Sequence, residues 1–187
     1  MVTDRPEGTV ALRLTEVEAY SGSGIDPAAH SHRGPTPRAA IMFGPPGRLY
    51  VYFSYGVHWC ANVVVGRDGD GEAVLLRAGE IVLGEEIACS RRPAARTARD
   101  LAGGPARLTQ ALAIGRDDLG IDLLDPASPV RLHRAPAPAG ISAGPRVGIT
   151  VATELAWRFW ETGAPSVSVF RAGGKPRPAG TGQDGLP

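Results

Sequence analysis

The chain has 187 residues, with 20 Lys and Arg against 19 Asp and Glu, so its formal net charge is +1. The length suits one domain, a composition of 43% hydrophobic and 21% charged residues excludes wholesale disorder, and no apolar run is long enough to cross a bilayer. The small net charge excludes a protein that coats nucleic acid by bulk basicity, and two cysteines, Cys60 and Cys89, exclude a disulfide framework and predict a reducing cytoplasm.

The first predicted element is a strand over residues 9–20, because Val10, Leu12 and Leu14 alternate with less apolar neighbours. Beyond them the alternation fails, since Glu16 and Glu18 fall on the face that carries the leucines. Either a bulge shifts the phase of the strand at this point, or a carboxylate points inward.

Residues 21–48 are rich in Gly, Pro and Ser and predict a long loop, with a short helix near Ala28–His32. A loop of this length in a compact domain is more often functional than idle. It overlaps a window, residues 27–67, that has four Arg and no Asp or Glu, and therefore carries +4. The window also holds six of the eleven aromatic residues, and arginine among aromatic side chains suits a surface that neutralises phosphates and stacks bases.

A meander follows, with strands over 49–55, 57–65 and 73–82 whose short turns predict antiparallel pairing. We expect a polar helix or exposed loop over residues 84–100 and a helix over residues 103–115. We expect a strand that enters a loop over residues 144–154, and further strands over 157–160 and 166–170. The fold class is therefore α+β: a single domain over residues 1–172, with a curved antiparallel β-sheet core flanked by helices. The tail over 173–187 has almost no apolar residues and is predicted to be disordered.

Glu18 is the first candidate for chemistry, because it closes a strand on a face expected to be apolar and precedes the long loop. A carboxylate in such a place can take a proton from water as a general base. The alternative is an exposed strand-end Glu in a small surface salt bridge.

Asn62 and Arg77 are polar residues in otherwise apolar strands. A buried Asn must be hydrogen-bonded, so Asn62 either staples the backbone or presents its amide to a ligand. A buried Arg needs an anionic or carbonyl partner, and for Arg77 the candidates are Glu18, a bound anion or a water.

Tyr52 and Tyr55 lie near the end of the strand over 49–55. Core packing explains Tyr52, whereas Tyr55 at the hairpin tip is harder to bury and could act as a wedge in a base stack. His30, in the acid-free window, could supply a flat ring or a hydrogen-bond donor.

Several other kinds of site are excluded by residue spacing. The residues of zinc-binding type, His30, His32, His58 and Cys60, lack the usual spacing of zinc ligands, so no metal is expected. A Gly-rich phosphate loop and the zinc deaminase signature are both absent from the sequence, and no cofactor is expected.

Several segments, in this order, resemble the alkyladenine (3-methyladenine) DNA glycosylase family. They are EVEAY (16–20), AAH (28–30), GPTPR (34–38), MFGPPGRLYVYFSYGVHWCANVV (42–64), AVLLRAGE (73–80), GPARLTQALAI (104–114) and GPRVGI (144–149). The resemblance implies a base-excision repair hydrolase that flips alkylated or deaminated purines out of double-stranded DNA and cleaves the N-glycosidic bond. It also implies a monomer in the cytoplasm, associated with the nucleoid, with no membrane partner.

The same resemblance implies roles for seven residues. The catalytic residues are Glu18 and Arg77, the substrate-binding residues are Tyr20, His30, Tyr52 and Asn62, and the DNA-intercalating residue is Tyr55. In this scheme Glu18 activates the attacking water and Arg77 helps to hold it. Tyr20, His30 and Tyr52 form stacking walls around the flipped base, while Asn62 clashes with the exocyclic amine of guanine.

The only lysine of the chain, Lys175, lies in the predicted tail. Glycosylases that also cut the strand form a Schiff base with an amine nucleophile. We therefore expect a monofunctional enzyme that leaves an intact abasic site.

Three alternatives remain at this stage. The first is a non-catalytic protein that binds lesions in the same pocket. The second is a truncated, inactive member, because the N-terminal helix usual in the family has no counterpart before EVEAY. The third, a sugar glycoside hydrolase, is disfavoured because such enzymes usually need two carboxylates and no second one has a placement comparable to that of Glu18.

Overall fold

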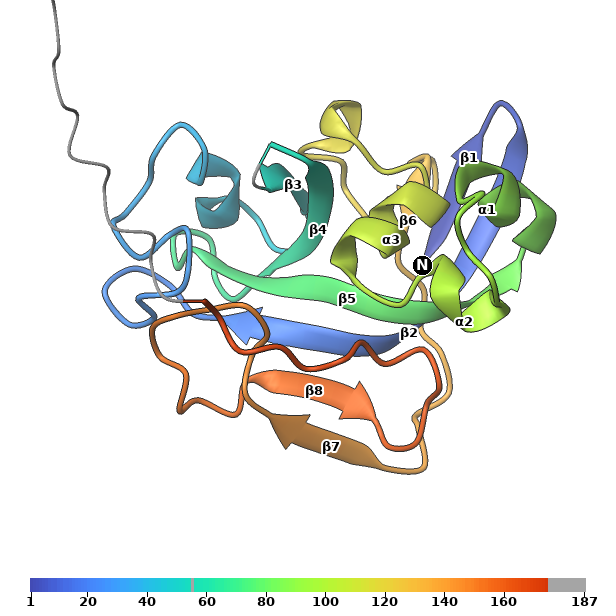
Figure 1. Cartoon of the computed structure of the whole chain (residues 1–187). Helices are drawn as coiled ribbons and strands as arrows, with labels where there is room; N and C mark the ends of the chain where they lie inside the picture. The colour runs from blue at the N-terminus through green and yellow to red at the C-terminus, as the bar shows by residue number, and fades with distance from the viewer. Residues whose placement is uncertain (55, 175–187) are drawn as a thin grey trace, which may run out of the picture.

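The computed structural model describes residues 1–54 and 56–174, and Figure 1 shows an antiparallel sheet at its centre. The strands follow the order β3-β4-β5-β2-β1-β6. They are β1 (Val2–Arg5), β2 (Gly8–Tyr20), β3 (Leu49–Ser54), β4 (His58–Val65), β5 (Glu72–Leu83) and β6 (Val130–Arg131). A further strand, β8 (Arg158–Glu161), pairs with β2 and with β7 (Ile141–Gly144).

Helices cover one side of the long strands β2 and β5, and the β7–β8 pair lies on the other side (Figure 1). The helices are α1 (Glu85–Arg91), α2 (Ala98–Leu101) and α3 (Pro105–Ala111). Leu101 of α2 and Leu108 of α3 are fully buried in the main core together with Leu12 and Leu76 of the sheet. The predicted α+β fold, with an antiparallel sheet flanked by helices, is confirmed.

The strands β3 and β4 divide their side chains between two faces. Leu49 and Val51 belong to the main core beneath the helices. Tyr50 packs instead with Met42 and Val64 in a smaller cluster. The predicted meander is confirmed by antiparallel pairing of β3 with β4 and of β4 with β5, and the face that carries Tyr50 holds the candidate site.

The pairing of β2 with β5 becomes irregular where the sequence alternation fails. The register shifts between Leu14 and Glu16 and again between Glu16 and Val17. As a result Leu14 and Val17 both pack against the main core, although they are three positions apart in one strand. The predicted bulge is present, and Glu16 and Glu18 are nevertheless buried, at 1% and 0% exposed.

The predicted helix near Ala28–His32 is wrong, since these residues form turns. The carboxylate of Asp26 accepts the backbone N–H of Ala28 at 3.0 Å, which favours a turn over a helix here. A 3-10 helix, η1 (Ala40–Phe43), lies further along the same loop, and a second, η2 (Arg116–Asp118), follows α3.

The predicted strands over 144–154 and 166–170 are also wrong. The strand β7 ends at Gly144, beyond which Pro145 lacks a backbone N–H and Ala152 has a left-handed φ of 51°. In the second segment the backbone N–H of Ser168 donates to the carboxylate of Glu16 rather than to a neighbouring strand.

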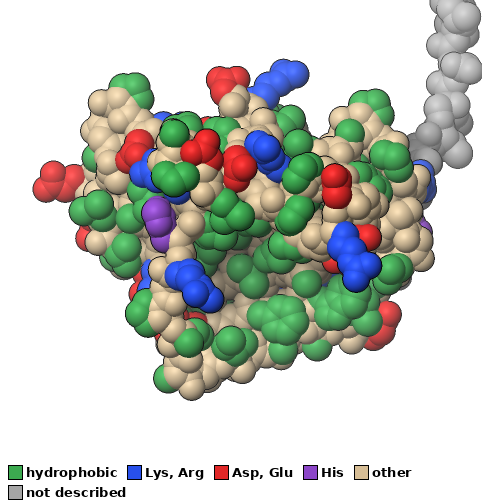
Figure 2. Space-filling model, turned by 180° about the vertical axis from the view of Figure 1, so that it is seen from behind, with side chains coloured by type: hydrophobic (Ala, Val, Ile, Leu, Met, Phe, Trp, Pro, Cys, Tyr) green, Lys and Arg blue, Asp and Glu red, His purple; other side chains and the backbone are tan. Residues whose placement is uncertain are grey.

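An apolar groove lies where β2 meets β8 and residues 132–138. The side chains that line it include Leu14, Leu132, Ile141 and Phe159. Figure 2 shows that hydrophobic side chains gather on the rear face of the molecule. Within residues 1–54 and 56–174, no helix is both long and apolar enough to span a membrane.

Candidate active site

A cleft of about 1160 Å³ opens among the strands β2 to β5, the loop that precedes β3, and residues 147–151. Six of the seven residues predicted to form the site line it: Glu18, Tyr20, His30, Tyr52, Asn62 and Arg77. The seventh, Tyr55, lies outside the described residues, as do Lys175 and the rest of the tail beyond Gly174.

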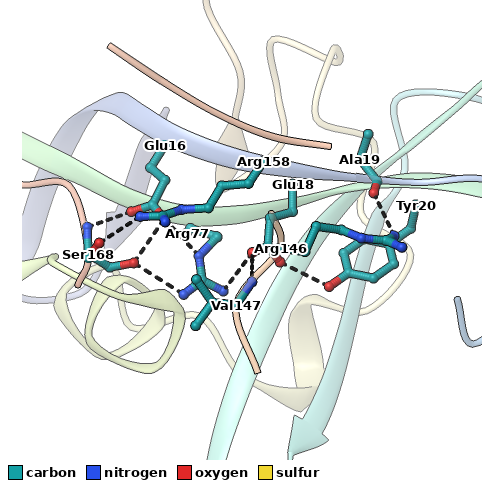
Figure 3. Close-up of polar contacts among 9 residues, drawn as sticks. All are labelled: Glu16, Glu18, Ala19, Tyr20, Arg77, Arg146, Val147, Arg158 and Ser168. Carbon is teal, nitrogen blue, oxygen red and sulfur yellow. Dashed lines mark hydrogen bonds and ion pairs between the residues drawn. The ribbon is translucent and has the colours of Figure 1, made fainter. Parts of the chain in front are cut away.

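The side chain of Glu18 is fully buried, so the alternative of an exposed strand-end Glu is wrong. Its carboxylate accepts hydrogen bonds from the Tyr20 hydroxyl at 2.9 Å and from the backbone N–H of Val147 at 2.7 Å (Figure 3). The Arg77 guanidinium approaches the same carboxylate to 3.4 Å. These donors offset the cost of removing a carboxylate from water, so the chain can keep an anion in the cleft.

Arg77 is held chiefly by Glu16, a contact that the sequence did not suggest. Its Nε donates to Glu16 Oε1 at 2.9 Å, which is shorter than its approach to Glu18. Glu16 also accepts hydrogen bonds from Nε of Arg158 at 2.6 Å and from the backbone N–H and hydroxyl of Ser168 at 2.6 and 2.8 Å. Glu16 is thus a second buried carboxylate on the same strand, but it does not line the cleft, where Glu18 is the only acidic side chain among the described lining residues.

Tyr20 is backed by a buried cation. The guanidinium of Arg146 lies 4.6 Å from the centre of the Tyr20 ring and donates to both carboxylate oxygens of Asp26, at 2.5 and 2.9 Å. Burial, together with the neighbouring Glu18 carboxylate, raises the pKa of Tyr20, so its hydroxyl stays protonated. Because Val147 follows Arg146 in the chain, the Arg146–Asp26 pair supports both hydrogen-bond donors to Glu18.

His30, Tyr50 and Tyr52 form an aromatic group at the cleft. The rings of His30 and Tyr52 meet edge to face, with centroids 4.5 Å apart, and His30 Nδ1 lies 2.9 Å from the Tyr50 hydroxyl. Desolvation of the His30 ring where it packs against these rings, together with the nearby Arg38, lowers its pKa to about 4, although the residue as a whole is exposed. The imidazole is therefore neutral near pH 7, and burial also raises the pKa of Tyr52, whose ring stays neutral too.

Asn62 lies on β4 with only 4% of its surface exposed. Its side-chain amide donates to the carbonyl of Tyr50, its partner on β3, at 3.1 Å. The predicted role as a backbone staple is confirmed. The same side chain lines the cleft, while its contact with a ligand stays a prediction.

The acid-free window contributes exposed cations, one of which, Arg38, lines the cleft. Arg33, Arg38 and Arg67 are exposed, and Arg38 lies over the Tyr52 ring at 5.1 Å from its centroid. Arg48 forms an ion pair with Asp122, at 3.7 Å. In the described part of the chain, no group of three or more His, Cys, Asp or Glu is arranged to hold a metal ion.

Sequence reasoning missed the buried and partly buried residues that support Glu18 and Arg77. They are Glu16, Asp26, Arg146, Val147, Arg158 and Ser168. Most of these contacts join distant segments; Glu16 and Ser168, for example, are 152 positions apart. One signal was available, since Glu16 shares a strand face with Glu18 in a region expected to be apolar.

Comparison with known proteins places these features in a family context. The family model that describes methylpurine-DNA glycosylase (MPG) matches residues 1–165. A protein of Nocardia farcinica named "Putative 3-methyladenine DNA glycosylase" is 54% identical over 170 residues, which cover 88% of this chain and 80% of that protein. Proteins of the same name from Frankia casuarinae and Mycobacterium tuberculosis are 53% and 51% identical, and they match 91% and 87% of this chain over 84% and 81% of their own lengths.

Proposed function

This chain belongs to the methylpurine-DNA glycosylase family, and we propose that it removes damaged purines from duplex DNA by hydrolysing the N-glycosidic bond. The observation that carries the proposal is the fully buried carboxylate of Glu18 in a cleft lined by aromatic rings. This combination suits a flipped-out nucleotide, whose base can stack on the rings while its sugar meets the carboxylate.

In the proposed reaction Glu18 accepts a proton from a water as the water oxygen bonds to C1′ of the deoxyribose. The bond from C1′ to the purine nitrogen breaks, and its electron pair leaves with the base. The transition state has oxocarbenium character, which the Glu18 carboxylate also stabilises. Arg77, which lies 3.4 Å from Glu18, is proposed to help hold the water.

The walls of the cleft suit a base that carries a positive charge. Tyr20, His30 and Tyr52 present rings to the cleft, and the lowered pKa of His30, about 4, keeps its imidazole neutral near pH 7. A neutral ring does not repel a cationic alkylated purine, and cation–π attraction to such rings is worth about 1–2 kcal/mol when water is excluded.

The finer parts of the proposal concern specificity and product. Asn62 is proposed to exclude normal guanine by a clash with its exocyclic amine, and Tyr55 to fill the base stack after the purine leaves it. The product is proposed to be an intact abasic site. Glycosylases that also cut the strand form a Schiff base with an amine, and the only lysine of this chain, Lys175, lies in the predicted tail.

The test is base release from duplexes that each carry one 3-methyladenine, 7-methylguanine, hypoxanthine or ethenoadenine. Released base is measured by chromatography, and strand breaks are measured before and after alkali. We expect base release from at least one duplex and breaks only after alkali. Breaks before alkali contradict the monofunctional mechanism, whereas tight lesion binding without base release favours the non-catalytic lesion-binding protein.

A further inference from the structure

We propose that Glu16 is a positioning residue for this reaction, which holds Arg77 back from Glu18 so that the Glu18 carboxylate stays available to a water. The inference rests on the proposed function, because it concerns how that reaction keeps its base active. Glu16 itself does not line the cleft, and it therefore acts through Arg77.

The guanidinium of Arg77 is divided between two carboxylates, and Figure 3 shows it between them. Its Nε donates to Glu16 at 2.9 Å and its Nη2 donates to the Ser168 hydroxyl at 3.2 Å. The remaining nitrogen, Nη1, faces Glu18 at 3.4 Å. A direct hydrogen bond between an arginine and a carboxylate is typically about 2.7–2.9 Å long, so the contact with Glu18 is loose and the contact with Glu16 is tight.

Glu16 can hold Arg77 firmly because it is itself fixed on several sides. Its Oε2 accepts the backbone N–H of Ser168 at 2.6 Å, and its Oε1 accepts Nε of Arg158 at 2.6 Å. Arg158 also donates to the carbonyl of Ser168 at 2.6 Å, which closes the cluster. The side chain of Glu16 is 1% exposed, so water does not compete for these contacts.

The charges of the buried cluster predict how removal of the Glu16 carboxylate affects Glu18. Glu16 and Glu18 carry two negative charges, and Arg77 and Arg158 carry two positive charges, so this buried cluster is balanced. Without the Glu16 carboxylate, Glu18 is the one anion left for both guanidinium groups, and Arg77 is drawn into a direct pair with it. A carboxylate held in such a pair is a poorer proton acceptor for water, while the aromatic walls that bind the base are unchanged.

The first test is Glu16→Gln, which keeps the shape of the side chain and removes its charge. Single-turnover base release is measured beside the Kd for a duplex with an abasic-site analogue. We expect the rate to fall roughly 10- to 100-fold, as for a misplaced catalytic group, with Kd unchanged. The matched control is Asp118→Asn, which breaks a largely buried pair between Asp118 and Arg5 at 2.7 Å, outside the cleft, and which is expected to leave the rate unchanged.

A double-mutant cycle separates positioning from a structural role. In an Arg77→Gln background Glu16→Gln is expected to cause no further loss of rate, because its effect passes through Arg77. Three results overturn the proposal: a further, additive loss of rate in the double variant, an unchanged rate in Glu16→Gln alone, or a loss of DNA binding in Glu16→Gln that parallels its loss of rate. If Glu16→Gln does not fold, Ser168→Ala replaces it, with a smaller loss of rate expected and an unchanged rate contradicting us. If the wild-type protein releases no base, the proposed function fails and this inference fails with it; if the wild type is active, a negative cycle rejects the inference alone.

Discussion

The backbone N–H of Val147 donates to the Glu18 carboxylate at 2.7 Å, although the two residues are 129 positions apart. Glu18 lies near the end of a long strand, whereas Val147 belongs to a segment without regular structure. The segment is held in place by its neighbour Arg146, whose guanidinium pairs with Asp26 in the loop after β2. The position of the candidate base therefore depends on a contact between the segment that holds Val147 and the end of β2.

Glu18→Gln is the direct test of the candidate base. The amide keeps the size of the side chain and cannot accept a proton, so we expect base release to fall by about 10²–10⁴-fold, the usual contribution of a general base. Binding to an abasic-site duplex should persist, because the aromatic walls remain. The control, Glu80→Gln, removes a carboxylate of a half-exposed pair with Arg13 on β2 and should leave the rate unchanged. Undiminished base release by Glu18→Gln would remove Glu18 from the mechanism.

The meander and the candidate base were predictable because both depend on local sequence. Short glycine turns between alternating strands predict neighbouring pairs, and β3, β4 and β5 pair in that way. The pattern drew attention to Glu18 because a carboxylate interrupts an apolar face, while its proposed role came from the resemblance to the glycosylase family. The supporting residues were not recognisable, since pairs such as Arg146 with Asp26 join segments 120 positions apart and no periodicity reports them.

The errors have a related cause. The sequence of residues 166–170 alternates as a strand does, yet the N–H of Ser168 is taken by the side chain of Glu16. A buried carboxylate is a stronger acceptor than a carbonyl, so it can draw a backbone N–H away from a sheet. Single-sequence patterns describe the backbone preference of a segment and carry no information on such a distant competitor.

Asp26→Asn tests the buried pair that supports Tyr20 and Val147. It leaves the guanidinium of Arg146, 2% exposed, without its anion, and we expect the free energy of unfolding to fall by about 3–5 kcal/mol. Urea denaturation measures the change. The control is Asp122→Asn, in a half-exposed pair with Arg48 at 3.7 Å, which should cost less than about 1 kcal/mol. Equal losses of unfolding free energy in the two variants would show that burial does not increase the contribution of the Asp26–Arg146 pair to stability.

The lowered pKa of His30 predicts that the stability of the protein depends on pH. Its pKa falls from an ordinary value of about 6.5 in the unfolded chain to about 4 in the folded protein. On acidification the unfolded chain therefore takes up the proton first, so the stability associated with neutral His30 is present above pH 6.5 and is lost as the pH falls toward 4. We expect the decrease in Tm between pH 6.5 and 4.5 to be smaller in His30→Gln than in the wild type. The control, His133→Gln, removes an imidazole that lies outside the cleft and should keep the wild-type curve. Identical curves for all three proteins would contradict the shift.

Asn62→Ala tests the proposed discrimination against guanine. The amide is fixed by its hydrogen bond to the Tyr50 carbonyl at 3.1 Å, so it cannot easily move away from a purine amine in the cleft. Its removal should raise guanine release relative to hypoxanthine release by about tenfold or more, the usual size of a small steric difference in a pocket. Loss of the buried hydrogen bond should also cost about 1 kcal/mol of stability.

Cys60→Ala is the matched control for this comparison, because Cys60 lines the cleft on the same strand two positions before Asn62. Both variants shorten a buried side chain, yet only Asn62→Ala removes the amide. The ratio of guanine to hypoxanthine release should therefore change in Asn62→Ala and stay at the wild-type value in Cys60→Ala. A ratio that changes equally in both would mean that cleft volume, rather than the amide, sets the discrimination. An unchanged ratio in Asn62→Ala would leave Asn62 as a backbone staple between β3 and β4.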